Sequence, residues 1–329
     1  MRANPTPGAL SAERRAAAAG AAAAVGGCLL VVAAAGLPGP RLAAQTLLAN
    51  AMLHSAALSI PFWGAVVALG WRRLGVAGML VAVALGATTL AGARWKAALA
   101  APPEAPRLTL VTFNMLFENP DPLPFLAWLE ATRPDVAVLQ EAQTLAPHLA
   151  RIDRLYPHRI GCDAECDLVV LSRLPVLRAD RLDLPRASRR MTSVRVSVGG
   201  APLWVHAVHW SRGFFGDSQV QTWAVNDAVR ARRRDGAPFV VAGDFNAAPW
   251  DPWLTTLMRQ QGLRHPPGWR PTWPIALGLL GMPIDHILTP SRVAVEEIAT
   301  LESAFGSNHR GVVARLALLS EIGRAPTQP

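Results

Sequence analysis

The 329-residue chain contains few residues of several types, and each shortage limits the classes of protein to which it can belong. It has one lysine (Lys96), one tyrosine (Tyr156) and three cysteines, and only 17% of its residues are charged. Arginine is used in place of lysine in a chain rich in alanine, a bias that indicates genome composition rather than chemistry. No internal repeat and no glycine-rich phosphate loop occur, which argues against a repeat protein or a P-loop nucleotide enzyme.

The positive charge is concentrated in the first third of the chain. The formal net charge is +9 and the isoelectric point is about 11.1, values that invite a nucleic-acid-binding interpretation. Residues 1–103 hold seven arginines, Lys96 and one acid, which gives +7, whereas residues 104–329 hold 24 arginines and 22 acids, which gives +2. Basic residues that flank apolar segments set membrane orientation. The charge is therefore poor evidence for a DNA-binding face.

Three apolar stretches precede residue 100, at Ala16–Leu37, Leu47–Gly70 and Leu74–Ala93. Roughly 20 apolar residues span a bilayer as a helix. We therefore predict a membrane module of three transmembrane helices over residues 1–98, followed by a Pro/Ala linker over residues 99–107. The first stretch could instead be a signal peptide. An uncleaved helix is preferred because further apolar stretches follow it.

The basic residues around these stretches favour a cytoplasmic N-terminus. Arginine pairs precede the first stretch and fill the turn between the second and the third. Three crossings then place the C-terminal domain, residues 108–318, on the extracytoplasmic side of the membrane. That membrane would be a bacterial inner (plasma) membrane. Cys162 and Cys166 are close enough to form a small disulfide loop in an oxidising compartment, or they are two unrelated thiols. Cys28, in the first stretch, is predicted to be an apolar filler.

Short apolar runs separated by turns follow the linker, with two stretches of helical spacing among them. Many strands with interspersed helices predict a layered α/β sandwich, and residues 319–329 are predicted to be a flexible tail. The predicted strands are Leu108–Phe113, Asp135–Leu139, Leu168–Leu171, Val194–Val198, Leu203–Val208, Phe239–Ala242, Ile284–Leu288 and Val312–Leu318, and the predicted helices are Phe125–Thr132 and Ser218–Arg234.

The most informative stretch is Val240–Asn246, in which apolar residues run into Gly-Asp-Phe-Asn. Residues two apart in a strand point to the same face, so Asp244 and Asn246 would project together from a strand end. A carboxylate beside an amide can orient a water molecule and hold an anionic oxygen, as phosphate-ester hydrolysis requires. A capped turn is the alternative, because Asp and Asn are common turn residues.

Five more polar residues occupy predicted strand ends or the turn before the last strand. Each has an ordinary structural explanation: a turn cap, a surface carboxylate, a hydrogen-bonded core imidazole, a turn aspartate or an exposed histidine. Seven separate structural explanations, counting Asp244 and Asn246, are a weaker hypothesis than one functional site that all seven residues share. The five residues are Asn114, Glu141, His209, Asp285 and His309.

The order and context of these residues resemble the endonuclease/exonuclease/phosphatase superfamily. The matching pieces are VTFN, VLQEA, VVLSRLPV, VHAVHW, VVAGDFNAAP, PIDHIL and GSNHRGVVARL, which together span residues 108–318. The run PTWP before PIDHIL further resembles the membrane-tethered bacterial branch of that superfamily. The resemblance implies an α/β (α+β) four-layer sandwich of two β-sheets flanked by helices, with the site at one edge.

The resemblance also implies a divalent metal, Mg²⁺ or Mn²⁺, and a set of residues around it. Glu141 would be the principal ligand, because a hard cation prefers carboxylate oxygen. Asn114 would hold a metal-bound water or a phosphate oxygen nearby. Asn308 would be a further metal ligand at the position where the family usually has aspartate, in a Ser-Asp-His motif that here reads Ser307-Asn308-His309.

The remaining residues would act on the water and the phosphate. Asp244 would orient and deprotonate the attacking water, and Asn246 would donate to a nonbridging phosphoryl oxygen. His309 would donate to the same oxygen while Asp285 fixes its tautomer. His209 matches the family's histidine at a strand end near the phosphate.

Two features depart from the family pattern. Asn308 loses one negative charge relative to aspartate, which predicts weaker metal binding or a lower rate. Nuclease branches often place a tyrosine near the phosphate, and the single tyrosine, Tyr156, lies in a different context.

We therefore expect a membrane-anchored metal-dependent phosphoesterase that hydrolyses a phosphodiester or a phosphomonoester. Its substrate would be a lipid headgroup, a nucleotide or a nucleic acid; the lipid bilayer is the other partner expected, and no protein partner is predicted. The alternatives are a DNA nuclease and a catalytically weakened binding homologue. The basic cluster at Arg230 and Arg232–Arg234 is interpreted as a solvated helix end rather than a DNA-binding surface.

Overall fold

The computed structural model describes residues 11–34, 48–93, 101–163, 166–184, 187–211 and 217–319. The chain divides into two compact units, Met1–Gly92 and Ala93–Pro329. The start of the predicted linker and all of the predicted tail except its first residue lie outside the described residues.

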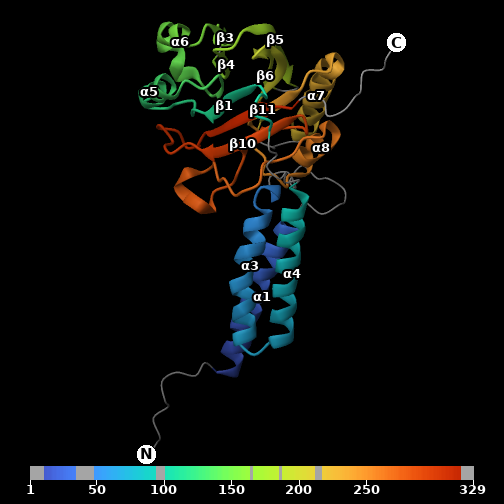
Figure 1. Ribbon diagram of the computed structural model, residues 1–329. Helices are drawn as coiled ribbons and strands as arrows, with labels where there is room; N and C mark the ends of the chain where they lie inside the picture. The colour runs from blue at the N-terminus through green and yellow to red at the C-terminus, as the bar shows by residue number, and fades with distance from the viewer. Residues whose placement is uncertain are drawn as a thin grey trace, which may run out of the picture. The chain divides into compact units, whose positions relative to one another are not determined.

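The described part of the first unit contains three helices: α1 (Ala12–Ala33), α3 (Met52–Ala68) and α4 (Arg72–Gly92). They lie side by side along their lengths (Figure 1). The indole of Trp63 lies against Gly26 and Gly78, where a Cβ atom would overlap the ring. Glycine at these two positions therefore lets the helices approach closely around one aromatic side chain.

Two of these helices, α1 and α4, are long and apolar enough to cross a membrane, on length and composition alone. The third, α3, has 17 residues and begins at Met52, after a turn, although the sequence predicted a span from residue 47. The outward faces of α1 and α4 carry exposed apolar side chains such as Val31 (71% exposed) and Leu80 (66% exposed).

The second unit contains two β-sheets. The six-stranded sheet has the order β10-β11-β1-β2-β4-β3 and the five-stranded sheet the order β5-β6-β7-β8-β9. Among the described strands, only the pairs β1–β2 and β7–β8 run parallel. The strands are β1 (Arg107–Asn114), β2 (Val136–Gln140), β3 (His158–Ile160), β4 (Leu168–Ser172), β5 (Val176–Leu184), β6 (Ala187–Val198), β7 (Ala201–His209), β8 (Phe239–Asp244), β9 (Asp285–Leu288), β10 (Val293–Thr300) and β11 (Val312–Leu318).

The two sheets pack face to face, and helices cover their outer faces. One apolar core lies between the sheets, a second lies between the six-stranded sheet and helices α5 and α6, and a third lies under α7 and α8 on the five-stranded sheet. This arrangement confirms the predicted four-layer sandwich (Figure 1). The helices are α5 (Leu123–Thr132), α6 (Leu149–Leu155), α7 (Asp217–Arg232) and α8 (Pro252–Gln261), with short 3₁₀ turns η1 (Gln143–His148), η3 (Arg233–Asp235) and η4 (Ile275–Leu280).

The local sequence explains the elements that support the site. Strands β2 and β8 are buried at every residue, as expected for strands covered on both faces. Helix α8 starts where the Asp251 carboxylate accepts hydrogen bonds from the backbone N–H groups of Trp253 and Leu254, a cap that stabilises a helix by about 1 kcal/mol. It ends at Gly262, which takes the left-handed conformation (φ 67°) that glycine adopts without strain.

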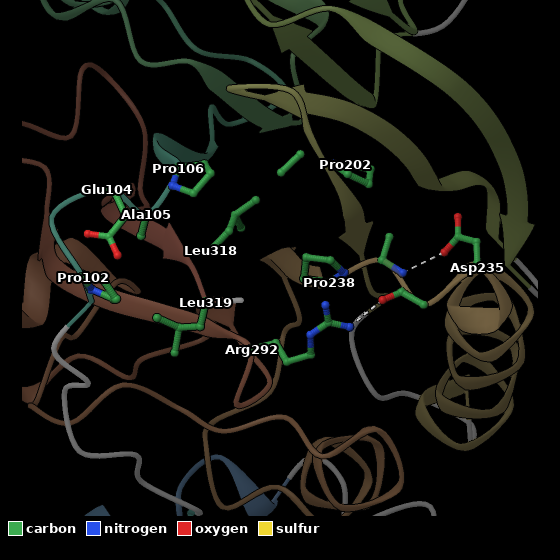
Figure 2. Close-up of a pocket in the computed structure, with 13 residues that line it drawn as sticks. Pro102, Glu104, Ala105, Pro106, Pro202, Asp235, Pro238, Arg292, Leu318 and Leu319 are labelled. Atoms are coloured by element: carbon green, nitrogen blue, oxygen red, sulfur yellow. Dashed lines mark hydrogen bonds between the residues drawn. The ribbon is translucent and has the colours of Figure 1, made fainter. Parts of the chain in front are cut away.

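A pocket lies at the start of the strands in the same unit (Figure 2). Its lining is mostly proline, alanine and leucine side chains from the segments before β1 and β8, the start of β7 and the end of β11. Arg292 donates from Nη1 to the carbonyl of Gly236 at its edge (2.5 Å), and Asp235 accepts from the N–H of Ala237. The predicted site residues lie at the other ends of these strands, so this pocket is separate from them.

Candidate active site

The predicted site residues gather where the two parallel strand pairs end. Asn114 is the last residue of β1, and Glu141 follows the last residue of β2. His209 and Asp244 end β7 and β8, and they are register partners. Asp285, the first residue of β9, is in turn the register partner of Asp244. Two sheets therefore contribute to a single cluster of polar side chains.

Asn114 links the two sheets. Its Nδ2 donates to Oδ2 of Asp244 at 2.9 Å and to Oε1 of Glu141 at 3.2 Å. Its Oδ1 accepts from the N–H of Leu116, which fixes the orientation of the amide. The Asn114 amide thus presents its hydrogens, not its oxygen, to the two carboxylates.

Glu141 lies at the open side of the cluster, with 23% of its side chain exposed. Its backbone has a φ of 49°, a conformation uncommon outside glycine. The N–H of Phe117 donates to Oε2 at 2.8 Å. One carboxylate oxygen is thereby held by the chain, while the other faces Asn114 and His209.

Asp244 is enclosed, at 1% exposure. Besides Asn114, its carboxylate accepts from the N–H of Asn246 at 2.7 Å and from Asn246 Nδ2 at 3.3 Å. The Asn246 amide also donates to the carbonyl of Trp210 at 2.8 Å. Burial raises the pKa of Asp244, the neighbouring carboxylate of Asp285 raises it further, and the nearby histidines and Asn114 oppose both.

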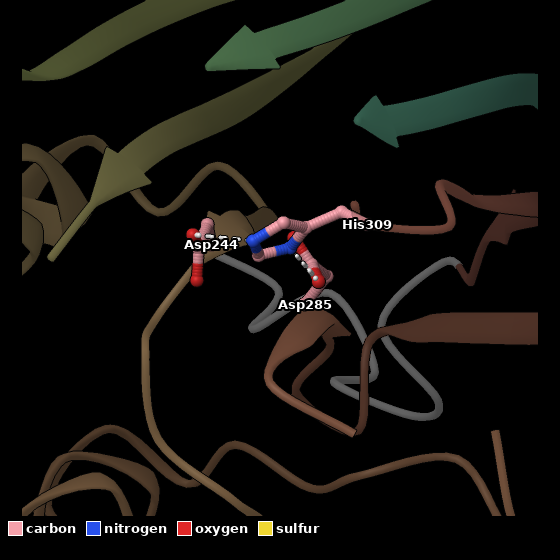
Figure 3. Close-up of side chains that lie close together, drawn as sticks. All are labelled: Asp244, Asp285 and His309. Carbon is pink, nitrogen blue, oxygen red and sulfur yellow. Dashed lines mark hydrogen bonds and ion pairs between the residues drawn. The ribbon is translucent and has the colours of Figure 1, made fainter. Parts of the chain in front are cut away.

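His309 is held by Asp285. Its Nδ1 lies 2.9 Å from Oδ2 of Asp285, and its Nε2 faces Asp244 Oδ2 at 4.0 Å (Figure 3). Burial lowers the pKa of His309, but the carboxylates of Asp285, Asp244 and Glu141 outweigh burial and raise it to about 9. The imidazole is therefore an imidazolium at neutral pH, with Nε2–H directed into the cluster.

His286, the residue after Asp285, points to the opposite side of β9. Its Nε2 lies 2.7 Å from the carbonyl of Ala247 and its Nδ1 lies 2.8 Å from Nε2 of His265. Burial lowers the pKa of His286 to about 4. Alternation along the strand therefore gives the site the aspartate of the Ile-Asp-His motif and gives the core its histidine.

Asp167 is a member of the cluster that the sequence analysis did not identify. Its Oδ2 lies 3.0 Å from Nδ1 of His209, and the guanidinium of Arg190 lies 3.3 Å away. Burial would raise the pKa of Asp167, but the hydrogen bond and charge of His209, with Arg190, lower it overall. Asp167 therefore faces His209 as an anion and directs the other ring nitrogen, Nε2, toward Glu141 at 3.7 Å and Asp244 at 4.0 Å.

The cysteines beside Asp167 are joined. Cys162 and Cys166 form a disulfide in the structure, which resolves the alternative that the sequence left open. The carbonyls of Cys166 and Asp167 accept from the N–H groups of Ala142 and Glu141. The disulfide thus closes the loop that lies against the Glu141 backbone.

The Ser307–His309 turn brings the last motif to the site. Ser307 donates from Oγ to the carbonyl of Asn114 at 2.7 Å and accepts from the N–H of His309 at 2.9 Å. Asn308 is half-buried, and its Oδ1 is buried with no hydrogen-bond partner among the described residues. A buried amide oxygen without a partner is costly unless another group occupies the position, so Asn308 Oδ1 fits a cation ligand.

One group of acidic and imidazole side chains among the described residues has the spacing to hold a metal ion. Asp244, Asp285 and His309 offer ligand atoms within 4.8 Å of one another (Figure 3). In that trio, Nδ1 of His309 is already paired with Asp285 and its Nε2 carries a proton, which disfavours a cation there. Oxygen atoms of the kind that a hard cation prefers also occur at Glu141, whose carboxylate is partly exposed, and at Asn308, whose Oδ1 has no hydrogen-bond partner among the described residues.

Tyr156 and the arginine cluster lie outside the site. The Tyr156 side chain is 1% exposed and packs in the core under α5 and α6, where burial raises its pKa. Arg232 pairs with Asp180 at 3.0 Å, and Arg233 donates to Gln261 and lies over the ring of Phe239. Arg232 and Arg233 therefore fasten α7 and η3 to the five-stranded sheet and to α8.

The comparisons with known proteins agree with this geometry. Residues 111–309 match the Endonuclease/Exonuclease/phosphatase family. An endonuclease/exonuclease/phosphatase from Beutenbergia cavernae is 25% identical over 65% of this chain and 72% of its own, with a TM-score of 0.52. No curated protein matches the chain in sequence.

More distant solved structures share the fold. An endonuclease/exonuclease/phosphatase from Bacteroides vulgatus is 16% identical over 64% of this chain and 99% of its own (TM-score 0.53). D. rerio TDP2, solved as a complex with a single-strand DNA product, is 16% identical over 64% of this chain and 98% of its own (TM-score 0.50). Because the family match covers more than half of the sequence and ends at His309, the chain belongs to the Endonuclease/Exonuclease/phosphatase family of phosphate-ester hydrolases.

Proposed function

We propose that this protein is a membrane-anchored, divalent-metal-dependent phosphoesterase that hydrolyses a phosphodiester or a phosphomonoester with an activated water molecule. The observation that carries the proposal is the surroundings of one carboxylate oxygen, Asp244 Oδ2. It lies 2.9 Å from the amide of Asn114 and 4.0 Å from the Nε2 atoms of both His209 and His309. A base that lies beside an amide donor and two oriented imidazole rings suits attack of water on an anionic ester.

Asp244 would orient the water and accept its proton. A carboxylate with a raised pKa is a stronger base than an ordinary aspartate, and Asp244 has its pKa raised by burial and by Asp285. Asn246 holds this carboxylate through both its N–H and its side-chain amide. In this arrangement Asn246 positions the base, and its donation to a phosphoryl oxygen would require the amide to leave Trp210.

His309 and His209 would bind the phosphoryl oxygens. The imidazolium of His309 donates through Nε2–H, and a charged donor forms a stronger hydrogen bond to an anionic oxygen than a neutral one. Each ring is oriented by an aspartate on its Nδ1, Asp285 for His309 and Asp167 for His209. Both rings are therefore held in place before a substrate arrives, so charge that develops in the transition state meets a fixed environment.

Glu141 and Asn308 would hold the metal, Mg²⁺ or Mn²⁺. When bound, the ion would neutralise phosphate charge and stabilise the negative charge that develops during hydrolysis. Asn114 would support the metal site indirectly, because its amide holds both Glu141 and Asp244 while its oxygen is turned to Leu116. Glu141 and Asn308 together supply one negative charge, which favours a modest affinity for the metal ion.

Membrane anchoring is supported by the first unit and by the disulfide. Helices α1 and α4 have the length and composition of spans and keep apolar side chains exposed on their outward faces. Disulfides persist in oxidising compartments, so the Cys162–Cys166 bond supports a catalytic domain on the extracytoplasmic side. A reporter enzyme fused to the C-terminus, active only on one side of the membrane, tests the orientation.

The activity is tested with the full-length protein in nanodiscs and two soluble probes, an aryl phosphodiester and an aryl phosphomonoester, each with Mg²⁺, Mn²⁺ or a chelator. Metal-dependent release of the aryl alcohol supports the proposal, and the ratio of the two rates gives the ester preference. A supercoiled-plasmid nicking assay separates a nuclease from an enzyme for smaller esters. A folded protein that hydrolyses neither probe with either metal would exclude the proposed function.

A further inference from the structure

An exposed apolar loop lies next to the candidate site. Within this loop, residues 274–282, three leucines stand out from the surface: Leu277 is 53% exposed, Leu279 81% and Leu280 68%. No charged residue occurs between Arg270 and Asp285. Single exposed leucines are ordinary, but three on one uncharged turn indicate a surface that contacts an apolar partner.

The backbone of this apolar loop is hydrogen-bonded internally. The N–H of Leu277 donates to the carbonyl of Pro274, and the N–H of Gly281 donates to that of Gly278. Trp273 and Met282 exchange both of their backbone hydrogen bonds across the base of the loop. Such a turn can enter an apolar medium with these peptide groups already paired, which is the main requirement for irregular backbone at a membrane surface.

A tryptophan fixes the tip of the loop. The indole N–H of Trp269 donates to the carbonyl of Leu279 at 2.8 Å, and the ring of Trp269 stacks on Trp250 with centroids 6.0 Å apart. Leu279, the most exposed of the three leucines, therefore belongs to a turn that is held in place by a hydrogen bond from Trp269.

The base of the loop is joined to the catalytic cluster. The N–H of Ile275 donates to the carbonyl of Asn308 at 3.2 Å, and the ring of Trp273 lies 6.3 Å, centroid to centroid, from the imidazole of His309. The Thr272 hydroxyl accepts from the N–H of Asp285. The base of the loop that carries the leucines is therefore attached directly to the turn and strand that hold His309 and Asp285.

We propose that the apolar loop inserts its leucines into the surface of a lipid bilayer and so presents the site to phosphate esters at headgroup level. The inference rests on the proposed membrane attachment, because a chain with two candidate spans keeps a lipid surface within reach. An uncharged turn suits the acyl region better than a charged protein or nucleic-acid surface. A lipid headgroup is then the favoured substrate class among those named above.

The test places an environment-sensitive dye on the loop of the full-length protein. In a Cys28→Ser background, Leu279→Cys is labelled and the protein is reconstituted into phosphatidylethanolamine/phosphatidylglycerol vesicles that contain nitroxide-labelled acyl chains. Leu177→Cys is the matched control, because Leu177 is 54% exposed on β5 of the same domain. We expect the dye at 279 to be quenched by the nitroxide lipid and protected from aqueous iodide, and the dye at 177 to show the reverse.

Three results would overturn the proposal. Quenching of the 279 dye by iodide without quenching by the lipid would mean that the loop stays in water. Protection from both quenchers would mean that it packs against another protein or a second copy. Equal lipid quenching at 279 and 177 would mean that tethering alone explains the contact. Because these signals do not depend on turnover, an inserted loop on a protein without phosphoesterase activity would separate failure of the proposed activity from failure of this inference.

Discussion

The carboxylate of Asp167 lies 3.0 Å from Nδ1 of His209 and leaves Nε2 of that ring facing Glu141 and Asp244. Asp285 makes the same contact with His309 at 2.9 Å. The site thus holds two aspartate–histidine pairs on either side of Asp244, one from each side of β8, and each pair fixes which ring nitrogen is available for the phosphate.

The first prediction concerns Asp167. Replacing it with asparagine removes the charge that selects the His209 tautomer, and we expect kcat to fall about 10- to 100-fold, as for other residues that orient a functional group. A steady-state assay against pH checks this, because a change confined to stability would not move the profile. Asp163→Asn is the control: Asp163 lies in the same segment, is 72% exposed and pairs with Arg181. Equal loss in both variants would contradict the assigned role.

The second prediction concerns the base. Asp244→Asn keeps the size of the side chain and removes its basicity, so kcat should fall about 10²- to 10⁴-fold. Asp227→Asn, on a residue of α7 that is 75% exposed, should retain full activity. A thermal unfolding curve for each variant ensures that the comparison is between folded proteins. An Asp244→Asn enzyme with near-normal kcat would assign the base to another group.

The third prediction concerns pH. Asp244 must be ionised to accept a proton, and its raised pKa places the acid limb of kcat/KM above the ordinary aspartate value of 3.8. His309 must be protonated to donate, and its pKa of about 9 places the alkaline limb there. A plot of kcat/KM against pH, measured at saturating Mg²⁺, should therefore be bell-shaped. His309→Gln should lower the plateau and abolish the alkaline limb; an unchanged limb would remove His309 from the donor role.

The fourth prediction concerns the residue at which the chain departs from its family. Asn308→Asp adds a negative charge beside the proposed metal position, where Oδ1 now has no partner. The metal concentration for half-maximal activity should fall on the order of tenfold, equivalent to about 1.4 kcal/mol. Titration of wild type and variant with Mg²⁺ by activity and by calorimetry checks this. An identical metal requirement would place the cation away from Asn308.

Much of this site could be predicted because its residues end buried strands. The runs Asp135–Leu139 and Phe239–Ala242 are recognisable as strands, and the polar residues that follow each run lie at a sheet edge. The α/β sandwich follows from the same alternation of runs and helices. The β11 boundaries were predicted as observed, because an apolar run and a turn coincide there.

Other features depend on contacts that one sequence does not reveal. Asp167 precedes β4, and only the antiparallel pairing of β4 with β2 brings it beside Glu141. Strand β5 was missed because arginines and aspartates alternate on its exposed edge. The orientation of the Asn114 amide is set by Leu116 and by two carboxylates from distant segments, so its role as a brace could not be predicted.

The pairing of β1 with β11 has a consequence for biosynthesis. Asn114 ends a strand whose outer neighbour is residues 312–318, and Ser307 must reach the Asn114 carbonyl before His309 is in place. During synthesis, the candidate membrane helices and most strands of both sheets are therefore made before β11, the antiparallel partner of β1. During that interval the edge of β1 that pairs with β11 is open, and His309 is not yet in place at the site. Activity then appears in one late step, so a chain truncated before residue 312 should be inactive and a target for quality-control proteases.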